Sequence, residues 1–331
     1  MTQTIQLDRP LDMHIHFRDG AMLQEVVPHT ARAFCGAVAM PNLVPPVDTL
    51  ERLLEYKQEI RDAANDPAFE SFVPLFFKAN DFATLEVVKP HIIGLKLYPE
   101  GATTNSDEGV KELDDALETI AHAEALDIPL LVHGETGGFV LDREAEYMKV
   151  YDHIARTFPK LRLIMEHITT AAAADFLDTH DNVYATITLH HLWYTLDDLM
   201  GGMLNPHLFC KPIVKTPKDR DAIRALAFQP HPKVMFGTDS APHPTEKKES
   251  ANGFAGCFSA PAALPMLVEL FEQHDALDSL QAFVSDHARR IYRIDPPAKT
   301  VTLEKRESTL PTQCGPVTPM AAGRVVPWSI V

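Results

Sequence analysis

The sequence lacks the features that would place this protein in a membrane or on nucleic acid. No apolar run reaches the roughly 18 residues needed to span a bilayer, and residues 1–9 show no basic segment followed by an apolar stretch. The formal net charge is −16, and no stripe of Lys and Arg is present to bind phosphates. We therefore expect no membrane and no nucleic-acid partner, whereas a small anionic substrate needs only a few well-placed cations.

Cysteine is scarce, and it is scattered along the chain. The four residues, Cys35, Cys210, Cys257 and Cys314, form no CxxC pair, which favours reduced thiols in the cytoplasm and argues against a structural zinc site built from thiolates. Hydrophobic residues make up 45% and charged residues 23% of the chain, close to the average for globular proteins. A core of ordinary size is therefore expected without disulfides.

Short apolar segments rich in β-branched residues alternate with helical patterns along the chain. Eight such segments are residues 11–17, 36–40, 72–77, 92–98, 129–133, 161–166, 183–188 and 234–238. Repeated strand–helix alternation implies parallel strands, and eight of them close a barrel. The main alternative, an open doubly wound sheet, usually has a Gly-rich phosphate loop after its first strand, and none is present. We predict an α/β fold, a single (β/α)8 barrel domain over residues 1–331.

Three of the intervening helices have clear sequence signals. Residues 50–64 carry apolar side chains on one helical face, with Asp48 and Glu51 as the predicted capping pair, and residues 110–121 show a similar pattern. A third helix is predicted to start at Thr216-Pro217, because proline suits the first helical position. Residues 295–331 are expected to pack on the barrel as an extension rather than form a β-sandwich domain.

Two histidines share one face of the first predicted strand. Side chains alternate along a strand, so His14 and His16 point to the same side, with Arg18 just beyond them. On the inner face of a barrel, two such imidazoles are suitably spaced to bind one metal ion. The alternative is a pair of ordinary, hydrogen-bonded core histidines.

The fourth predicted strand contains a lysine, Lys96, among apolar residues. Burial disfavours the ammonium form and lowers its pKa, and a neutral amine can react with CO2 to give a carbamate. A carbamate is an anion with two oxygen atoms that can bridge two metal ions. Alternatively, Lys96 reaches the rim of the barrel or pairs with a carboxylate.

Further metal-ligand residue types follow the later strands. His133 ends the fifth predicted strand, His167 follows the sixth, and Asp239 and His243 follow the eighth. Barrel enzymes place their chemistry at the C-terminal ends of the strands, so these residues are expected on one rim. Histidine and carboxylate donors suit zinc and leave room for a bound water molecule.

Taken together, these segments resemble the amidohydrolase superfamily and, within it, the class II dihydroorotases. The resemblance covers nearly the whole chain, and the segments that carry it are residues 12–20, 40–43, 95–99, 102–105, 131–135, 166–170, 206–210, 237–243 and 255–258. It implies reversible, zinc-dependent hydrolysis of the cyclic amide of L-dihydroorotate to N-carbamoyl-L-aspartate, in pyrimidine biosynthesis. Relatives of this kind are often homodimers.

The resemblance also implies a role for each matching residue. One zinc ion would be held by His14, His16, Asp239 and N6-carboxylated Lys96, and a second by the same carbamate with His133 and His167. Asp239 would also transfer the proton during catalysis. The residues implied in substrate binding are His16, Arg18, Asn42, Thr103, Thr104, His133, Lys211, His243 and Ala255. Among them, Arg18, Asn42 and His243 would bind the substrate carboxylate, and Thr103 and Thr104 would lie on a mobile loop.

Two positions depart from the family pattern, namely Lys211, where an apolar residue is expected, and His190, where Gln is expected.

Two other functions stay open. A dihydropyrimidinase or hydantoinase would act on a ring that lacks the carboxylate. A metal-free scaffold would only support a partner such as aspartate transcarbamoylase, although such copies usually lose metal ligands and none is missing here.

Overall fold

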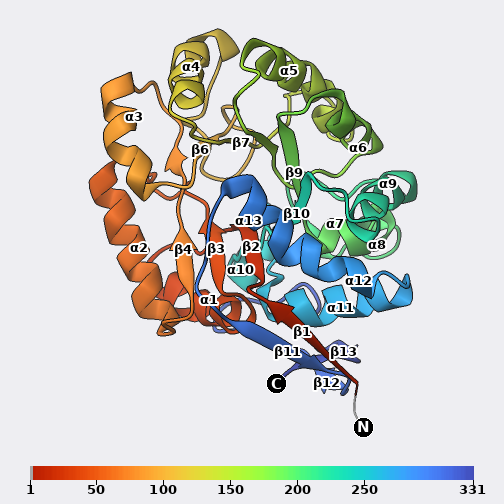
Figure 1. The fold of residues 1–331 in the computed structure, drawn as a ribbon. Coiled ribbons are helices and arrows are strands. Elements are labelled where there is room, and N and C mark those ends of the chain that lie inside the picture. Colours follow the sequence, from red (N-terminus) through yellow and green to blue (C-terminus); the bar gives the residue numbers. More distant parts are fainter. Residues whose placement is uncertain (1–2) are drawn as a thin grey trace.

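The computed structural model describes residues 3–331, and its centre is a closed barrel of parallel strands surrounded by helices (Figure 1). The barrel strands are β2 (Leu11–Ile15), β3 (Gly36–Ala39), β4 (Glu70–Phe72) with β5 (Leu75–Phe76), β6 (Leu95–Leu97), β7 (Leu130–Val132), β8 (Leu163–Met165), β9 (Val183–Ile187) and β10 (Val234–Phe236). All eight predicted strands are therefore present, and the (β/α)8 prediction is confirmed.

The third barrel strand is interrupted, because residues 73 and 74 separate β4 from β5. β4 pairs with β3 and β5 pairs with β6, both in parallel. Pro74 lacks the N–H that a continuous ladder would need at this point. The barrel closes between β10 and β2, where the Asp239 amide donates to the His14 carbonyl (2.7 Å) and the His16 amide donates to Ser240 (3.0 Å).

Most of the helices surround the barrel, whereas α10 (Thr245–Lys248) and α13 (His287–Tyr292) lie over its middle in the view of Figure 1. The other helices are α1 (Gly20–Ala33), α2 (Leu50–Ala64), α3 (Phe82–Val88), α4 (Leu117–Ala125), α5 (Arg143–Thr157), α6 (Ala171–Phe176), α7 (Leu189–Trp193), α8 (Leu196–Met200), α9 (Pro217–Phe228), α11 (Ala263–Gln273) and α12 (Leu277–Gln281). Over residues 3–331, none of the helices is both long enough and apolar enough to cross a membrane.

The helix predictions are correct in position but not in every detail. α9 begins with Pro217 and is capped by Thr216, as predicted. The predicted cap of α2 is wrong by one residue, because the hydroxyl of Thr49 accepts the first-turn amide while Asp48 pairs with Lys78 (2.6 Å). The helix predicted over residues 110–121 starts later, at Leu117, after a 3₁₀ turn (Leu113–Ala116).

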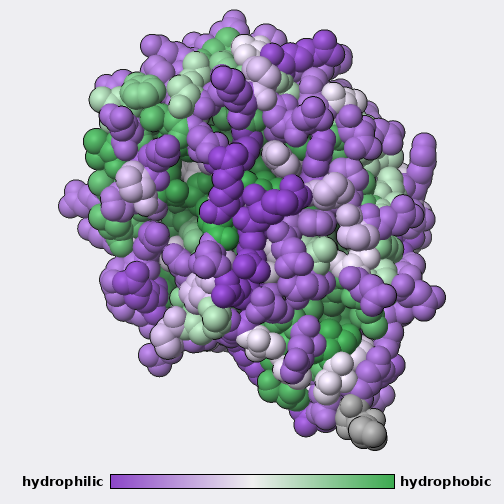
Figure 2. All heavy atoms as spheres, in the orientation of Figure 1, coloured by the Kyte–Doolittle hydropathy of each residue, from purple (hydrophilic) through white to green (hydrophobic). Residues whose placement is uncertain are grey.

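The two ends of the chain meet in a small antiparallel sheet that the sequence did not reveal. β1 (Thr4–Asp8) pairs with β11 (Thr300–Glu304), which also pairs with β14 (Ser329–Ile330), and β12 (Ser308–Thr309) pairs with β13 (Val325–Val326). Trp328 is fully buried, and its indole donates to Glu272 on α11 (3.1 Å). Figure 2 shows a mostly hydrophilic face, with apolar side chains gathered near this terminal sheet.

Candidate active site

A small enclosed cavity lies at the C-terminal ends of the barrel strands. The residues that line it are His14, His16, Arg18, Asn42, Tyr98, Thr103, Thr104, His133, His167, Lys211, Asp239, Ala241, Ala255 and Gly256. Most of the site residues predicted from the sequence are thus brought together around one space. Lys96 and His243 are not part of the lining, but both lie directly behind it, as described below.

One group of donors joins β2 to the segment after β10. The Asp239 Oδ1 atom lies 3.1 Å from His16 Nε2 and 3.6 Å from His14 Nε2. The ligand atoms of these three buried residues all lie within 4.8 Å of one another, a spacing from which they can hold a metal ion. The two imidazoles hold the pKa of Asp239 well below its usual range, although burial opposes this, so the carboxylate is ionised.

A second pair of donors comes from the ends of β7 and β8. His133 Nδ1 lies 3.1 Å from His167 Nε2. Two imidazoles on one tetrahedral zinc ion place their nitrogens about 3.3 Å apart, so this pair matches two ligands of a single ion. His133 Nε2 donates to the Glu135 carboxylate (2.8 Å), which fixes the ring and leaves Nδ1 free to bind metal. The other ring nitrogen of His167 is buried and has no hydrogen-bond partner among residues 3–331.

Lys96 on β6 is fully buried, and its ammonium nitrogen has no hydrogen-bond partner in the described structure. The nitrogen lies 5.1 Å from the centre of the Tyr98 ring, which lines the cavity. Burial lowers the pKa of Lys96 to about 8, although the nearby carboxylates of Glu166 and Asp239 oppose the shift. About a tenth of this lysine is therefore a neutral amine at pH 7, far more than for an exposed lysine.

Two buried carboxylates that the sequence interpretation passed over hold the ligands in place. Glu166 accepts hydrogen bonds from His14 Nδ1 (2.7 Å) and from the Thr186 hydroxyl (2.6 Å), so His14 keeps its Nε2 lone pair for a metal ion. Asp12 accepts the Thr238 amide (2.7 Å) and hydroxyl (2.6 Å), which fastens β2 to the segment that carries Asp239. Burial raises the pKa of both carboxyls to about 7.

These donor sets fit zinc. Imidazole and carboxylate groups are its usual ligands, and the second shell of carboxylates is of the kind that orients zinc-bound histidines. The buried nitrogen of Lys96 has no hydrogen-bond partner within residues 3–331, which is unfavourable without a further group at this position. The residues present can therefore hold metal at this rim of the barrel.

A cationic group lies opposite the metal-ligand side chains. The Arg18 Nε donates to the Pro242 carbonyl (3.2 Å), and its Nη2 lies 3.1 Å from His243 Nε2. The same imidazole nitrogen lies 2.9 Å from the Ala255 carbonyl. Burial lowers the pKa of His243 to about 3, assisted by the charges of Arg18 and Lys248, so the imidazole is neutral and Arg18 supplies the positive charge.

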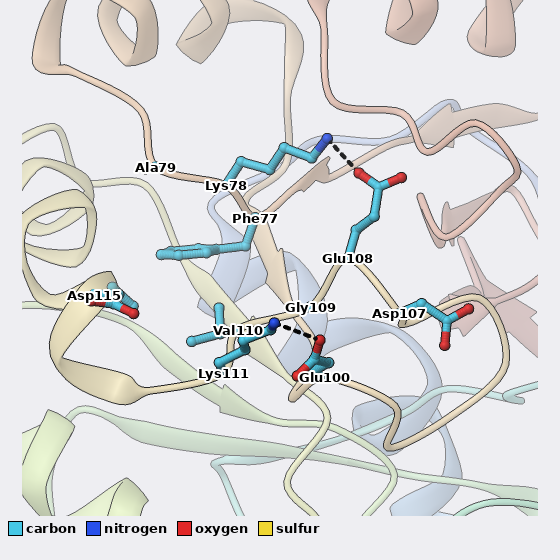
Figure 3. Close-up of a pocket in the computed structure, with 11 residues that line it drawn as sticks. Phe77, Lys78, Ala79, Glu100, Asp107, Glu108, Gly109, Val110, Lys111 and Asp115 are labelled. Atoms are coloured by element: carbon cyan, nitrogen blue, oxygen red, sulfur yellow. Dashed lines mark hydrogen bonds and ion pairs between the residues drawn. The ribbon is translucent and has the colours of Figure 1, made fainter.

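The segment that carries Thr103 and Thr104 is folded over the cavity. The Asn42 side-chain amide donates to the Thr104 carbonyl (2.9 Å), and the buried Ser106 hydroxyl accepts the Thr103 amide (3.0 Å). At the base of this segment Lys78 pairs with Glu108, and a second ion pair joins residues 100 and 111 beside a surface pocket (Figure 3). These exposed ion pairs contribute little stability individually, so the segment is held mainly by Asn42 and Ser106.

Lys248 holds together the remaining wall of the cavity, a role that no sequence pattern indicates. Its buried ammonium donates to three backbone carbonyls, those of Phe209 (2.8 Å), Phe254 (2.9 Å) and Gly256 (2.7 Å). It thereby joins the chain just before Lys211 to the chain on either side of Ala255. A lysine five residues after His243 is ordinary in sequence, and only the fold shows that it is buried.

Comparison with known proteins agrees with this arrangement. Residues 12–294 match the amidohydrolase family model. The dihydroorotase of Helicobacter hepaticus is 42% identical, over 100% of this chain and 98% of that protein. The crystal structure of the Campylobacter jejuni dihydroorotase superposes with a TM-score of 0.96 at 46% identity, over 100% of this chain and 98% of that one. The structure of the Saccharomyces cerevisiae dihydroorotase in complex with 5-fluoroorotic acid superposes with a TM-score of 0.94 at 32% identity, over 99% of this chain and 98% of that one. The chain therefore belongs to the amidohydrolase family and, within it, to the dihydroorotases, which are cyclic amide hydrolases.

Proposed function

We propose that this enzyme hydrolyses the cyclic amide of L-dihydroorotate reversibly to N-carbamoyl-L-aspartate. The observation that carries the proposal is the pairing, in one cavity, of a metal-ligand cluster with an oriented arginine. The cluster can hold metal that activates water to attack an amide, and Arg18 can bind a carboxylate on the same substrate. The yeast relative with bound 5-fluoroorotic acid, a pyrimidine carboxylate, agrees with this substrate class.

The proposed centre holds two zinc ions. His14, His16 and Asp239 would hold one, His133 and His167 the other, and a carbamate on Lys96 would bridge them. Carbamate formation joins the neutral amine nitrogen to the carbon of CO2 and releases one proton. The buried, unpartnered nitrogen of Lys96 supports this assignment, because a carbamate bound to two cations would satisfy it.

The chain's own residues would position the substrate and move a proton. Arg18, Asn42 and His243 would bind the ring carboxylate, the backbone at Lys211 and Ala255 would contact the ring, and Thr103 and Thr104 would exclude water. His16 and His133 line the same cavity and would also touch the substrate.

Bound zinc ions would lower the pKa of water from 15.7 to about 7 and polarise the ring carbonyl. The ionised Asp239 carboxylate would take a proton from the attacking water and deliver it to the ring nitrogen as the amide bond breaks. General acid–base transfer of this kind typically contributes ~10²–10⁴ in rate.

The alternative cyclic amidases, dihydropyrimidinase and hydantoinase, would leave Arg18 without a function, since their substrates carry no such carboxylate. A metal-free scaffold would not need a complete set of ligands.

The proposal also includes cytoplasmic location, a homodimer, and a single domain in which residues 295–331 pack on the barrel. Sedimentation velocity tests the dimer.

The decisive test compares substrates on the zinc-loaded enzyme. Ring opening of L-dihydroorotate, dihydrouracil and hydantoin is followed by ultraviolet absorbance at equal enzyme concentration. We expect efficient turnover of dihydroorotate alone. Preference for either ring without a carboxylate would replace the proposed substrate, and absence of turnover on all three would favour the scaffold.

A further inference from the structure

A second cluster of metal-ligand side chains lies outside the catalytic cavity. His190 is on α7, after β9, Cys210 precedes Lys211, and Cys257 follows Gly256. All three side chains are buried, and their ligand atoms all lie within 4.8 Å of one another. None of them belongs to the proposed catalytic centre.

The ring of His190 has no partner although it is fully buried. Neither of its nitrogens makes a hydrogen bond in the described structure. A buried polar group left without a partner is destabilising, so an unpaired imidazole beside two thiols needs an explanation. Imidazole nitrogen and cysteine sulfur are together the donors that structural zinc sites use.

We propose that His190, Cys210 and Cys257 form a separate, structural zinc site. On one tetrahedral zinc ion the ligand atoms lie about 3.5–3.8 Å apart, so the cluster needs only a small contraction. A further imidazole lies beside the cluster, with His191 Nε2 3.7 Å from Cys210 Sγ and 2.9 Å from the Pro212 carbonyl. The absence of a CxxC pair argued against a zinc site built from thiolates. In the folded protein, however, two cysteines that are 47 positions apart in the sequence lie close together.

The Cys210 thiol has a hydrogen-bond partner within the protein, because its Sγ donates to the Pro212 carbonyl (3.1 Å). Zinc binding would release the proton of each thiol and leave two thiolates whose charge balances the ion.

Such a site would fix the wall of the catalytic cavity. Cys210 adjoins Lys211, and Cys257 lies two residues after Ala255, the two residues proposed to contact the substrate ring. The Gly256 amide donates to the Phe209 carbonyl (2.8 Å). The Cys257 carbonyl accepts the Ala241 amide (2.7 Å), which links the cluster to the segment after β10. The ion would act as a positioning element, with no contact to the substrate.

The test counts metal and does not depend on activity. The protein is purified under reducing conditions with zinc, dialysed, and analysed by elemental mass spectrometry. Cys210→Ala and Cys257→Ala should each hold one zinc ion fewer per chain than the wild type. Cys35→Ala and Cys314→Ala also remove buried cysteines, outside the cluster, and should hold the wild-type amount.

Cobalt substitution gives an independent readout. The proposed catalytic ligands include no sulfur, so a near-ultraviolet sulfur-to-cobalt charge-transfer band would report only the new site. His190→Gln, which keeps both thiols, should lose or strongly weaken this band, and it serves where an alanine variant does not fold. Equal zinc content in wild type and cluster variants, absence of the band, or a Cys210–Cys257 disulfide found by thiol titration would each overturn the proposal.

Discussion

Arg18 offers the sharpest test of substrate recognition, because the structure orients it before any substrate arrives. It follows β2 in a left-handed backbone conformation (φ 62°), and the Pro242 carbonyl and His243 hold two of its nitrogens. Arginine stays charged even where burial lowers its pKa, so the guanidinium presents a rigid cationic fork to the cavity. Neither Met nor Lys is β-branched, so both replacements tolerate this backbone about as well as Arg.

Arg18→Met removes the carboxylate partner. Two hydrogen bonds to a charged group, each worth about 1.5–3 kcal/mol, sum to about 3–6 kcal/mol. At tenfold per 1.4 kcal/mol, kcat/KM for dihydroorotate should fall about 10²–10⁴-fold, mainly through KM. Arg18→Lys keeps the charge but loses the planar fork of the guanidinium, so its kcat/KM should lie between those of Arg18→Met and the wild type.

The assay is steady-state ring opening, with zinc content measured on the same samples. Full zinc content in both variants shows that the metal centre is intact. An unchanged KM for dihydroorotate in Arg18→Met, with normal zinc content, would refute the proposed carboxylate contact.

Three further variants probe other parts of the site. Asp239→Asn should keep most of its zinc but lose ~10²–10⁴ in kcat, and near-normal turnover would remove Asp239 from proton transfer. Lys96→Ala should lose zinc and activity, with partial rescue of both by added short carboxylic acids, whereas full zinc content would exclude the bridging role. The pKa of His243 is lowered to about 3 in the folded protein, so below about pH 6.5 only the unfolded chain takes up a proton at this residue. The free energy of unfolding therefore decreases as the pH falls below about 6.5. Denaturant unfolding of metal-free protein between pH 7 and pH 5 should therefore show a loss about 2 kcal/mol larger in wild type than in His243→Gln.

Much of the barrel could be predicted because each strand is a short, buried apolar run between helices. The interruption of the third strand at Pro74 was visible in principle, since proline cannot donate to a ladder. The terminal sheet could not be found in the same way. β12, β13 and β14 are two residues long, too short to carry a periodicity of their own, and β1 pairs with β11 at the other end of the chain.

The ligand residues of the site are predictable from the ends of the strands. The residues that hold these ligands and the cavity wall in place by hydrogen bonds are not. Glu166 adjoins His167, and its position alone does not indicate that it accepts a hydrogen bond from His14, 152 residues away. Lys248 and the pair of Cys210 with Cys257 depend on loops that meet only in the folded protein. Contacts of this kind are set by tertiary packing, which local sequence patterns do not encode.

The most direct test of the whole account is removal and return of the metal. Zinc is chelated from the purified protein, and dihydroorotate ring opening is followed by ultraviolet absorbance before and after zinc is added back. The account predicts that turnover disappears with the metal and returns as zinc rebinds. Full turnover by the metal-free protein, or a zinc-loaded protein that leaves dihydroorotate unchanged, would contradict it.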